Sequence, residues 1–335
     1  MTASATRLTG VDFADPVLES AIRAGLARVE ERLHEAATSR YPFVTEVARH
    51  LMQAGGKRFR PLLVLLAAEF GDRPEAAEVV DSAVVVELTH LATLYHDDVM
   101  DEADVRRSAE SANSRWTNSV AILTGDFLFA QASEILAELG PEAVRIQART
   151  FSRLVEGQIM ETVPAPDGSD PVDYHLAVLT QKTGSLIATC LRFGALFAGC
   201  PPEVVHALIR YGETIGVAFQ LSDDILDIAS DSVESGKTPG TDLREGIRTL
   251  PVLYALASTD PGEARLRELL SRPLTDDAEH AEALHRLRHS SALKSARGIV
   301  ERFADQARDE LAALPDIPAR AALHSLVDFM IARTG

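Results

Sequence analysis

Helical periodicity runs through almost the whole chain and restricts it to helical architectures. Between residues 17 and 37, the apolar side chains of Val17, Ile22, Leu26, Val29 and Leu33 recur on one face, with charged residues between them. This is the 3.6-residue spacing of an amphipathic helix. Further helices are expected at 75–104, 117–139, 141–163, 173–198, 202–229, 249–258, 262–271, 277–289, 291–313 and 317–333.

Signals for a sheet or for a second domain are weak. No series of alternating apolar and polar residues lies between turn signals. The breaks at residues 164–172 and 230–242 have the length of loops rather than of linkers. The sequence therefore predicts an all-α chain in which residues 1–335 form a single domain.

Net charge and cysteine content limit which binding partners and which cellular compartment are expected. The formal net charge is −17, and so acidic a surface repels phosphate backbones, so no nucleic-acid partner is expected. Cys190 and Cys200 fit neither a disulfide framework nor a zinc pattern, and reduced thiols are expected. The N-terminal segment lacks the apolar core of a signal peptide, and apolar runs such as 62–68 are too short to span a bilayer. A cytoplasmic protein without a transmembrane segment is therefore expected.

One acidic pattern, DDxxD, occurs twice, each time near the C-terminal end of a long apolar helix. On a helix, positions i and i+4 share a face, and like charges at this spacing cost about 0.2–0.5 kcal/mol per pair. Carboxylates without nitrogen or sulfur ligands nearby suit a hard cation, with Mg²⁺ first. A solvated acidic face is the alternative, but two near-copies at the ends of apolar helices disfavour it. The carboxylates are those of Asp97, Asp98, Asp101, Asp223, Asp224 and Asp227.

Basic residues complete the charged motifs. A glycine turn with three cations precedes one helix, and exposed backbone N–H groups beside Lys and Arg form a phosphate cradle. Paired arginines follow the first acidic cluster, and two lysines lie further along the chain. This set suits two polyanions, one bound through metal and one bound directly. In chain order, the cations are Lys57, Arg58, Arg60, Arg106, Arg107, Lys182 and Lys237.

These motifs resemble those of the all-trans isoprenyl diphosphate synthases, also called polyprenyl synthetases. The similarity extends over most of the chain, from about Gly55 to Pro251. The motifs are GGKRFRP (55–61), ELTHLATLYHDDVMDEADVRR (87–107), LTGDFLFAQA (123–132), QKTGSLI (181–187), GVAFQLSDDILDIASD (216–231) and GKTPGTDLREGIRTLP (236–251).

The resemblance implies a helical bundle around a central active-site cavity, usually in a homodimer. It implies a transferase that condenses isopentenyl diphosphate with an allylic diphosphate through Mg²⁺-assisted ionisation, 1'-4 coupling and proton loss. Three Mg²⁺ ions per active site are expected, and product release would involve transient membrane contact. Preorganised metals and cations stabilise the charge that develops on a departing diphosphate, and no dedicated side-chain base is needed.

The resemblance also assigns roles to individual residues. Asp97, Asp101 and Asp223 would hold Mg²⁺, and Asp98, Asp224 and Asp227 would support them. Arg106, Lys182 and Lys237 would contact the allylic diphosphate, with Thr183 and Gln220 nearby. The diphosphate of isopentenyl diphosphate would be held by Lys57, Arg60, His90 and Arg107, with Gly56 and Arg58 at its edge.

Small residues precede the first acidic cluster on the same helix. Ala92 and Thr93 lie about one turn before Asp97, where members of this family carry the residues that set product length. Because neither side chain is bulky, a product of C20 or longer is expected. Phe127 or Phe129 is a candidate for a floor deeper in the tunnel.

Two alternatives accompany this interpretation, and the sequence departs from the family pattern at several positions, among them Ile247 in place of a common lysine. A class I terpene cyclase usually has a different second metal motif and does not need the Lys57 and Arg60 cradle. A subunit of a heteromeric prenyl synthase is the other alternative, although all six motif aspartates are present. Ser108 stands where a glycine is usual, and Arg333 is the only late cation in place of a basic C-terminal tail.

The Ala92 position gives the first prediction. Replacing Ala92 with Phe should shorten the product, because the larger ring would fill the space below the first acidic cluster. Sizing the extracted products of the wild type and of Ala92→Phe by chromatography checks this. Products of unchanged length would place the tunnel elsewhere.

Overall fold

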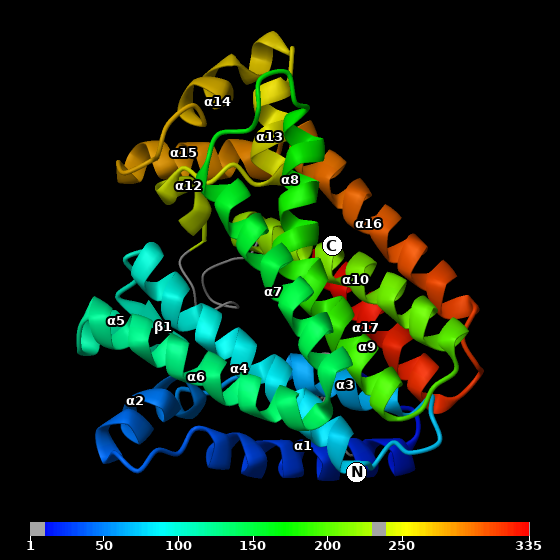
Figure 1. Ribbon diagram of the computed structural model, residues 1–335. Helices are drawn as coiled ribbons and strands as arrows, with labels where there is room; N and C mark the ends of the chain where they lie inside the picture. Colours follow the sequence, from blue (N-terminus) through cyan, green and yellow to red (C-terminus); the bar gives the residue numbers. More distant parts are fainter. Residues whose placement is uncertain (1–10, 230–238, 335) are drawn as a thin grey trace, which may run out of the picture. The chain divides into compact units, whose positions relative to one another are not determined.

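The computed structural model describes residues 11–229 and 239–334, and these residues are almost wholly helical (Figure 1). Strand structure in this part of the chain consists of one antiparallel ribbon, β1 (Val105–Arg106) with β2 (Ala109–Glu110). The predicted all-α class is therefore confirmed.

The chain divides into two compact units, named here unit 1 and unit 2. Unit 1 is formed from Met1–Phe151, Leu186–Ile209 and Ala313–Leu323, and unit 2 from Ser152–Ser185, Arg210–Ala312 and His324–Gly335. The single-domain organisation stays a prediction. Four helices contribute residues to both units: α7 (Pro141–Thr162), α9 (Ser185–Phe197), α10 (Pro202–Ala229) and α17 (Pro318–Thr334).

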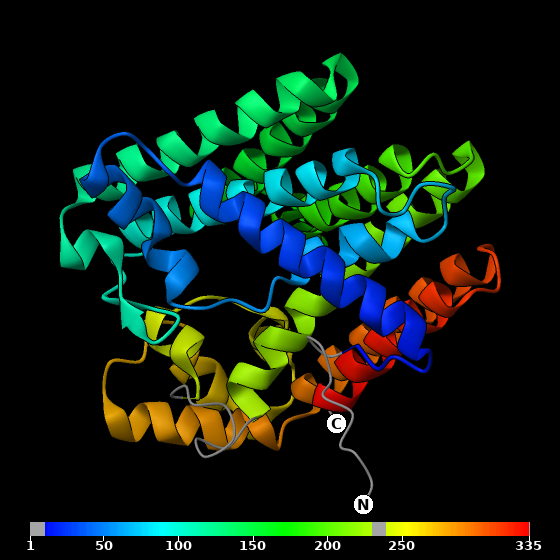
Figure 2. The same cartoon turned by 90° about the horizontal axis from the view of Figure 1, so that it is seen from below.

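Unit 1 is organised around α4 (Ala77–Met100). This helix packs against α1 (Pro16–Ala36), α3 (Phe59–Ala68) and α6 (Asn118–Leu139), and Figure 2 shows α1, in blue, lying against it. The middle of α4 has no exposed face, because Val84, Val85, Val86 and Leu88 are all fully buried. This agrees with a sequence that is apolar almost all round. The two cysteines, also in unit 1, are free thiols.

Unit 2 has its own apolar core. Buried side chains from the second half of α10, including Leu221 and Ile225, pack with Leu250 and Val300. Burial of these apolar groups supplies the main favourable free energy of folding. The other elements of this unit are α8 (Pro171–Leu179), η1 (Thr180–Gly184), α12 (Thr241–Glu245), α13 (Leu250–Ala257), η2 (Pro261–Glu263), α14 (Ala264–Leu269), α15 (Asp277–Arg288) and α16 (Ser291–Ala312).

Proline and capping side chains determine where many helices begin. Asp15 accepts a hydrogen bond from the backbone N–H of Val17 at 2.7 Å, and Asp170 accepts one from Val172 at 2.9 Å. Each bond satisfies an N–H group that has no partner inside the helix. Proline, which needs no such partner, is the first residue of α1, α2 (Pro42–Gln53), α7, α8, α10 and α17.

Several elements differ from the sequence expectation. The helix expected over 173–198 is interrupted by the π-helical turn η1, which separates α8 from α9. A π-turn changes the hydrogen-bond repeat locally, and apolar spacing over a long window does not reveal it. The short elements α2, α5 (Ala112–Arg115), α12 and the ribbon lie outside the expected helices.

One described helix, α6, is long and apolar enough to cross a membrane by length and composition. Its mean hydropathy is 1.4 over an 18-residue window, of which 39% is buried. The uninterrupted apolar runs of the sequence did not reveal it, because Asp126 and Glu134 divide the helix. A core helix of a globular protein meets the same criterion, so the finding concerns length and composition alone.

Tyr95 ties α4 to α2. Its ring is fully buried, and its hydroxyl donates to the carbonyl oxygen of Val47 and accepts from the backbone N–H of Leu51 at 3.2 Å. Buried polar groups are nearly always paired in this way, because an unpaired one loses its hydration without compensation. Tyr95 therefore fixes the end of α2 from which the glycine turn departs.

Removing the Tyr95 hydroxyl should destabilise unit 1. Tyr95→Phe removes two buried hydrogen bonds between α4 and α2, so the free energy of unfolding should fall by about 1–3 kcal/mol. Urea unfolding followed by circular dichroism measures the change. Tyr41→Phe, at a side chain that is 60% exposed, is the control and should change the stability by less than about 0.5 kcal/mol. Equal stabilities of the two variants would contradict this role of Tyr95.

Candidate active site

The first acidic cluster lies where α4 ends. Asp97 and Asp98 are in its last turn, and Asp101 is its C-cap residue. Asp98 is fully buried, and its Oδ1 accepts a hydrogen bond from Nε of Arg106 at 2.5 Å, whereas Asp101 is exposed and lies 3.8 Å from the same guanidinium. Burial raises the pKa of Asp98, and the hydrogen bond from Arg106 opposes that rise. The cluster thus combines one anchored carboxylate with accessible ones.

The second acidic cluster lies in the last turns of α10, in unit 2. Asp224 is buried, accepts a hydrogen bond from Nε2 of Gln220 at 3.0 Å, and lies 3.7 Å from Nε2 of His175. Asp223 is more exposed and is paired with Arg333 at 2.6 Å.

Asp227 completes this cluster and has a structural contact of its own. Its two carboxylate oxygens accept hydrogen bonds from the backbone N–H groups of Thr241 and Asp242 at 3.2 Å each, at the start of α12. The carboxylate at the end of α10 thus holds the start of the next helix. Like Asp98 and Asp224, Asp227 is anchored to its neighbours.

Both clusters need positive charge. A carboxylate at the C-terminal end of a helix meets the negative end of the helix dipole, and Arg106 and Arg333 compensate part of that charge. Among the described residues, no three His, Cys, Asp or Glu side chains converge closely enough to hold a metal ion alone. The donor set still fits Mg²⁺, which takes one or two carboxylates and completes its shell with waters and substrate phosphates. Metal binding by these six aspartates stays a prediction.

The predicted phosphate cradle comes together within unit 1. Arg60, Arg107 and His90 are partly buried close to one another, and Nε of Arg60 is buried without a hydrogen-bond partner among the described residues. Burial lowers the pKa of Arg60 and of Arg107. Lys57 is exposed beside this group. A set of buried guanidinium groups with an unpaired N–H donor is suited to an anion.

The pKa of His90 is affected by these arginines. Burial, followed by the positive charges of Arg60 and Arg107, holds the pKa of His90 well below its ordinary value of 6.5. The ring is therefore neutral at neutral pH, with one nitrogen able to donate and the other able to accept. A neutral donor among cations can bind a phosphate oxygen without adding another desolvated charge.

The paired arginines are placed by the β-ribbon. Arg106 pairs with Ala109 across the ribbon, and the two residues between them, Arg107 and Ser108, have φ values of 53° and 61°. Two positive φ values are the pattern of a type I′ turn, which favours glycine or asparagine. The turn explains why glycine would suit position 108, where this chain has Ser108. The turn directs Arg106 to Asp98, and Nη1 of Arg107 to the carbonyl oxygens of Leu51 and Gly55.

The remaining predicted cations belong to unit 2. Lys182 and Thr183 lie in η1, and Nζ of Lys182 contacts Oε2 of Glu161 at 2.5 Å. Gly157 of α7 approaches this turn so closely that a Cβ atom there would lie 2.6 Å from the backbone nitrogen of Lys182. The close approach of the two backbones holds the π-turn in place. Lys237 lies outside the described residues.

The strip before the first acidic cluster is part of the core of unit 1. Ala92 is fully buried, and the Thr93 hydroxyl donates to the carbonyl oxygen of His90 at 2.8 Å. One turn earlier, Thr89 accepts a hydrogen bond from Nε2 of Gln147 at 2.7 Å. On α6, Phe129 packs against the rings of His96 and Phe151. The role of Ala92 and Thr93 in product length stays a prediction.

Sequence reasoning missed the partners of the predicted residues. Each is an ordinary polar side chain, far along the chain from the residue that it contacts, and of these partners only Glu87 lies within a quoted motif. The paired residues are Glu30 and Glu87 with Arg58, Glu161 with Lys182, His175 with Asp224, and Arg333 with Asp223.

Known proteins share these motifs and this fold. The sequence profile of the family described as Polyprenyl synthetase matches residues 41–287. A "Nonaprenyl diphosphate synthase" of Mycobacterium tuberculosis is 51% identical over the full length of both chains. A "Heptaprenyl diphosphate synthase component 2" of Geobacillus stearothermophilus is 40% identical, over 90% of this chain and 93% of its own.

Solved structures agree with the sequence comparisons. A geranylgeranyl pyrophosphate synthase from Corynebacterium glutamicum, solved with calcium and isoprenyl diphosphate, aligns with a TM-score of 0.87 at 47% identity, covering 97% of this chain and 100% of its own. The resemblance drawn from the motifs is confirmed. This chain therefore belongs to the polyprenyl synthetase family.

Proposed function

We propose that this chain is an all-trans prenyltransferase that couples isopentenyl diphosphate to an allylic diphosphate and gives a polyprenyl diphosphate of C20 or longer. The enzyme class and the medium-to-long product agree with relatives named as nonaprenyl, decaprenyl and geranylgeranyl synthases. The cradle of Arg60, His90 and Arg107 carries the proposal, because it is suited to a diphosphate held without metal.

The residues of the chain have separate tasks in this reaction. The cradle would hold isopentenyl diphosphate and orient its double bond, which lowers the entropic cost of bringing two substrates together. Arg106 and Lys182 would bind the allylic diphosphate as it leaves, and Lys182 would exchange its contact with Glu161 for a phosphate oxygen. The allylic cation left behind is attacked by the double bond, and a proton then goes to the departed diphosphate. Apolar helix walls would exclude water from the cation.

A divalent ion is part of the proposal. Mg²⁺ bound by the accessible Asp97, Asp101 and Asp223 would neutralise the leaving diphosphate. The related synthase from Corynebacterium glutamicum was solved with calcium and isoprenyl diphosphate, which supports use of a divalent ion. Three ions per site stay a prediction, as does a cytoplasmic location with transient membrane contact at product release.

A homodimer is proposed as the assembly. Ile122 and Leu123, which are adjacent on α6, are 43% and 65% exposed. Large apolar side chains gathered on a surface are typical of protein interfaces. Light scattering on the purified chain gives the mass of the assembly. A heteromer is the second candidate, because one relative is named component 2 of its synthase.

The direct test supplies radiolabelled isopentenyl diphosphate, Mg²⁺ and allylic primers of increasing length, followed by sizing of the extracted products. A ladder of elongated products supports the proposal and gives the preferred primer. Cyclisation of a single allylic substrate without incorporation of label would favour a class I terpene cyclase. No extension by the chain alone, but extension when a partner subunit is added, would indicate a heteromer.

Substitution at either acidic cluster should abolish turnover. Asp97→Ala and Asp223→Ala each remove a proposed metal ligand, so steady-state turnover should fall by at least about a hundredfold, with the fold retained. The far-ultraviolet circular dichroism spectrum checks the fold. Asp167→Ala, at an exposed loop aspartate, is the control and should keep its activity. Near-normal turnover in either cluster variant would refute the metal assignment.

The cradle also predicts a pH response. Because the folded-state pKa of His90 lies below its ordinary value of 6.5, the unfolded chain takes up a proton that the folded chain does not as the pH falls through that value. The free energy of unfolding should therefore fall more steeply between about pH 7 and pH 5 in the wild type than in His90→Gln. Urea unfolding at a series of pH values measures the two slopes. Identical slopes would contradict the low pKa.

A further inference from the structure

A buried carboxylate lies among the cations of the cradle. Glu87, on α4, is 2% exposed and precedes His90 by one helical turn. Its negative charge acts on Arg58, Arg60 and Arg107. A buried charge without partners is expensive, so Glu87 stabilises each of the three guanidinium groups, which repel one another, before any substrate arrives.

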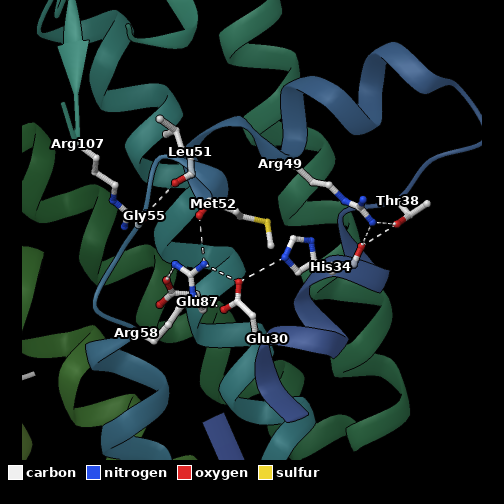
Figure 3. Close-up of polar contacts among 10 residues, drawn as sticks. All are labelled: Glu30, His34, Thr38, Arg49, Leu51, Met52, Gly55, Arg58, Glu87 and Arg107. Carbon is white, nitrogen blue, oxygen red and sulfur yellow. Dashed lines mark hydrogen bonds and ion pairs between the residues drawn. The ribbon is translucent and has the colours of Figure 1, made fainter. Parts of the chain in front are cut away.

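Arg58 connects Glu87 to a second helix. Its guanidinium makes a bidentate contact with Glu30 of α1, at 2.7 Å from Nε and 3.0 Å from Nη2, and its Nη1 reaches Oε1 of Glu87 at 3.3 Å (Figure 3). Nη2 also donates to the carbonyl oxygen of Met52 at 3.4 Å. These four contacts hold the Arg58 guanidinium within the protein, and its expected place at the edge of the substrate site stays a prediction.

The backbone of Arg58 shows that these contacts constrain the chain. Its φ of 50° is left-handed, a conformation that is unfavourable for residues other than glycine and persists only where the surroundings enforce it. Arg58 is also the N-cap residue of α3, so its backbone sets where Phe59 and Arg60 enter that helix. The carboxylates that hold the Arg58 side chain therefore fix the start of α3.

The glycine turn is folded closely around two guanidinium groups. A Cβ atom on Gly56 would lie 2.6 Å from Nη1 of Arg58 and 2.8 Å from Nη1 of Arg107. Nη1 of Arg107 in turn donates to the carbonyl oxygen of Leu51 at 3.0 Å and to that of Gly55 (Figure 3). Lys57 lies in the chain between these contacts, so its backbone position depends on both arginines.

We propose that Glu87, together with Glu30 acting through Arg58, is a positioning residue that preforms the cradle for the diphosphate of isopentenyl diphosphate. Glu87 holds Arg58 in the left-handed conformation and keeps the arginines of the cradle together. This orients Lys57 and Arg60 toward one site. The inference rests on the proposed function, because it concerns the same substrate.

The structure offers variants that separate positioning from general stability. Glu87→Gln keeps the shape and removes the charge, Glu30→Gln removes the outer carboxylate, and Arg58→Lys removes the bidentate contact. The matched control is Asp81→Asn, because Asp81 of α4 pairs with Arg32 of α1 at 3.1 Å and so joins the same two helices by an ion pair of its own.

Two readouts are compared for every variant. The first is the KM for isopentenyl diphosphate and the KM for the allylic primer at saturating Mg²⁺. The second is the affinity for isopentenyl diphosphate by calorimetry in EDTA, where the acidic clusters hold no metal. In Glu87→Gln, the KM and the dissociation constant for isopentenyl diphosphate should each rise about tenfold, while the KM for the primer stays within about twofold. Glu30→Gln and Arg58→Lys should change in the same direction, and Asp81→Asn should match the wild type.

Other outcomes overturn the inference. Tighter binding in Glu87→Gln would mean that the carboxylate only repels the substrate. An equal rise in both KM values, or a lower melting temperature with unchanged KM values, would mean a purely structural role. If Glu87→Gln does not fold, the Glu30→Gln variant provides the test of positioning. Glu30 is 40% exposed, and its loss leaves Arg58 paired with Glu87, so this variant should fold. If the wild type itself does not bind isopentenyl diphosphate, the proposed function fails instead.

Discussion

Burial of the middle of α4 on every side is the constraint on which the candidate site depends. A helix enclosed by α1, α3 and α6 cannot rotate or slide without opening the core of unit 1. The side chains that it carries are therefore fixed along one rigid element: Glu87 and His90 at the cradle, Ala92 in the core, and Asp97 and Asp98 at its end. The 1.5 Å rise of a helix sets their spacing, so the anion site and the acidic cluster have a constant separation along α4.

Opposite charges are balanced differently in the cradle and in the acidic clusters. The cradle has more cations than carboxylates, and Glu87 compensates only part of the excess. At the first acidic cluster the carboxylates outnumber the cations, because Arg106 faces both Asp98 and Asp101. In both places the protein leaves a charge that a ligand of opposite sign can complete, an anion in one and a cation in the other. In the proposed reaction, two diphosphates, one of them carried with metal ions, would satisfy both demands.

Much of the fold and the residue types of the site could be predicted from the sequence, because helical periodicity and ordered motifs act over short spans of chain. The bounds of α6, α7 and α10 lie within one residue of the expected ranges. The π-turn at Lys182 and the turn at Arg107 could not be predicted, since each depends on a local backbone geometry that periodicity does not report. Glu30, Glu161 and Arg333 were missed for another reason: an ion pair between residues far apart in sequence is decided by tertiary packing.

The two-residue turn of the ribbon links the first acidic cluster to the cradle through the chain itself. Arg106 turns toward the acidic cluster and Arg107 toward the glycine turn, yet one peptide bond joins them. Consecutive Cα atoms are about 3.8 Å apart whatever the side chains are. In the proposed reaction, the leaving pyrophosphate and the diphosphate retained on the five-carbon unit would therefore be contacted by adjacent residues of one turn, and a substitution elsewhere that changes the length of the lipid would not separate these two contacts.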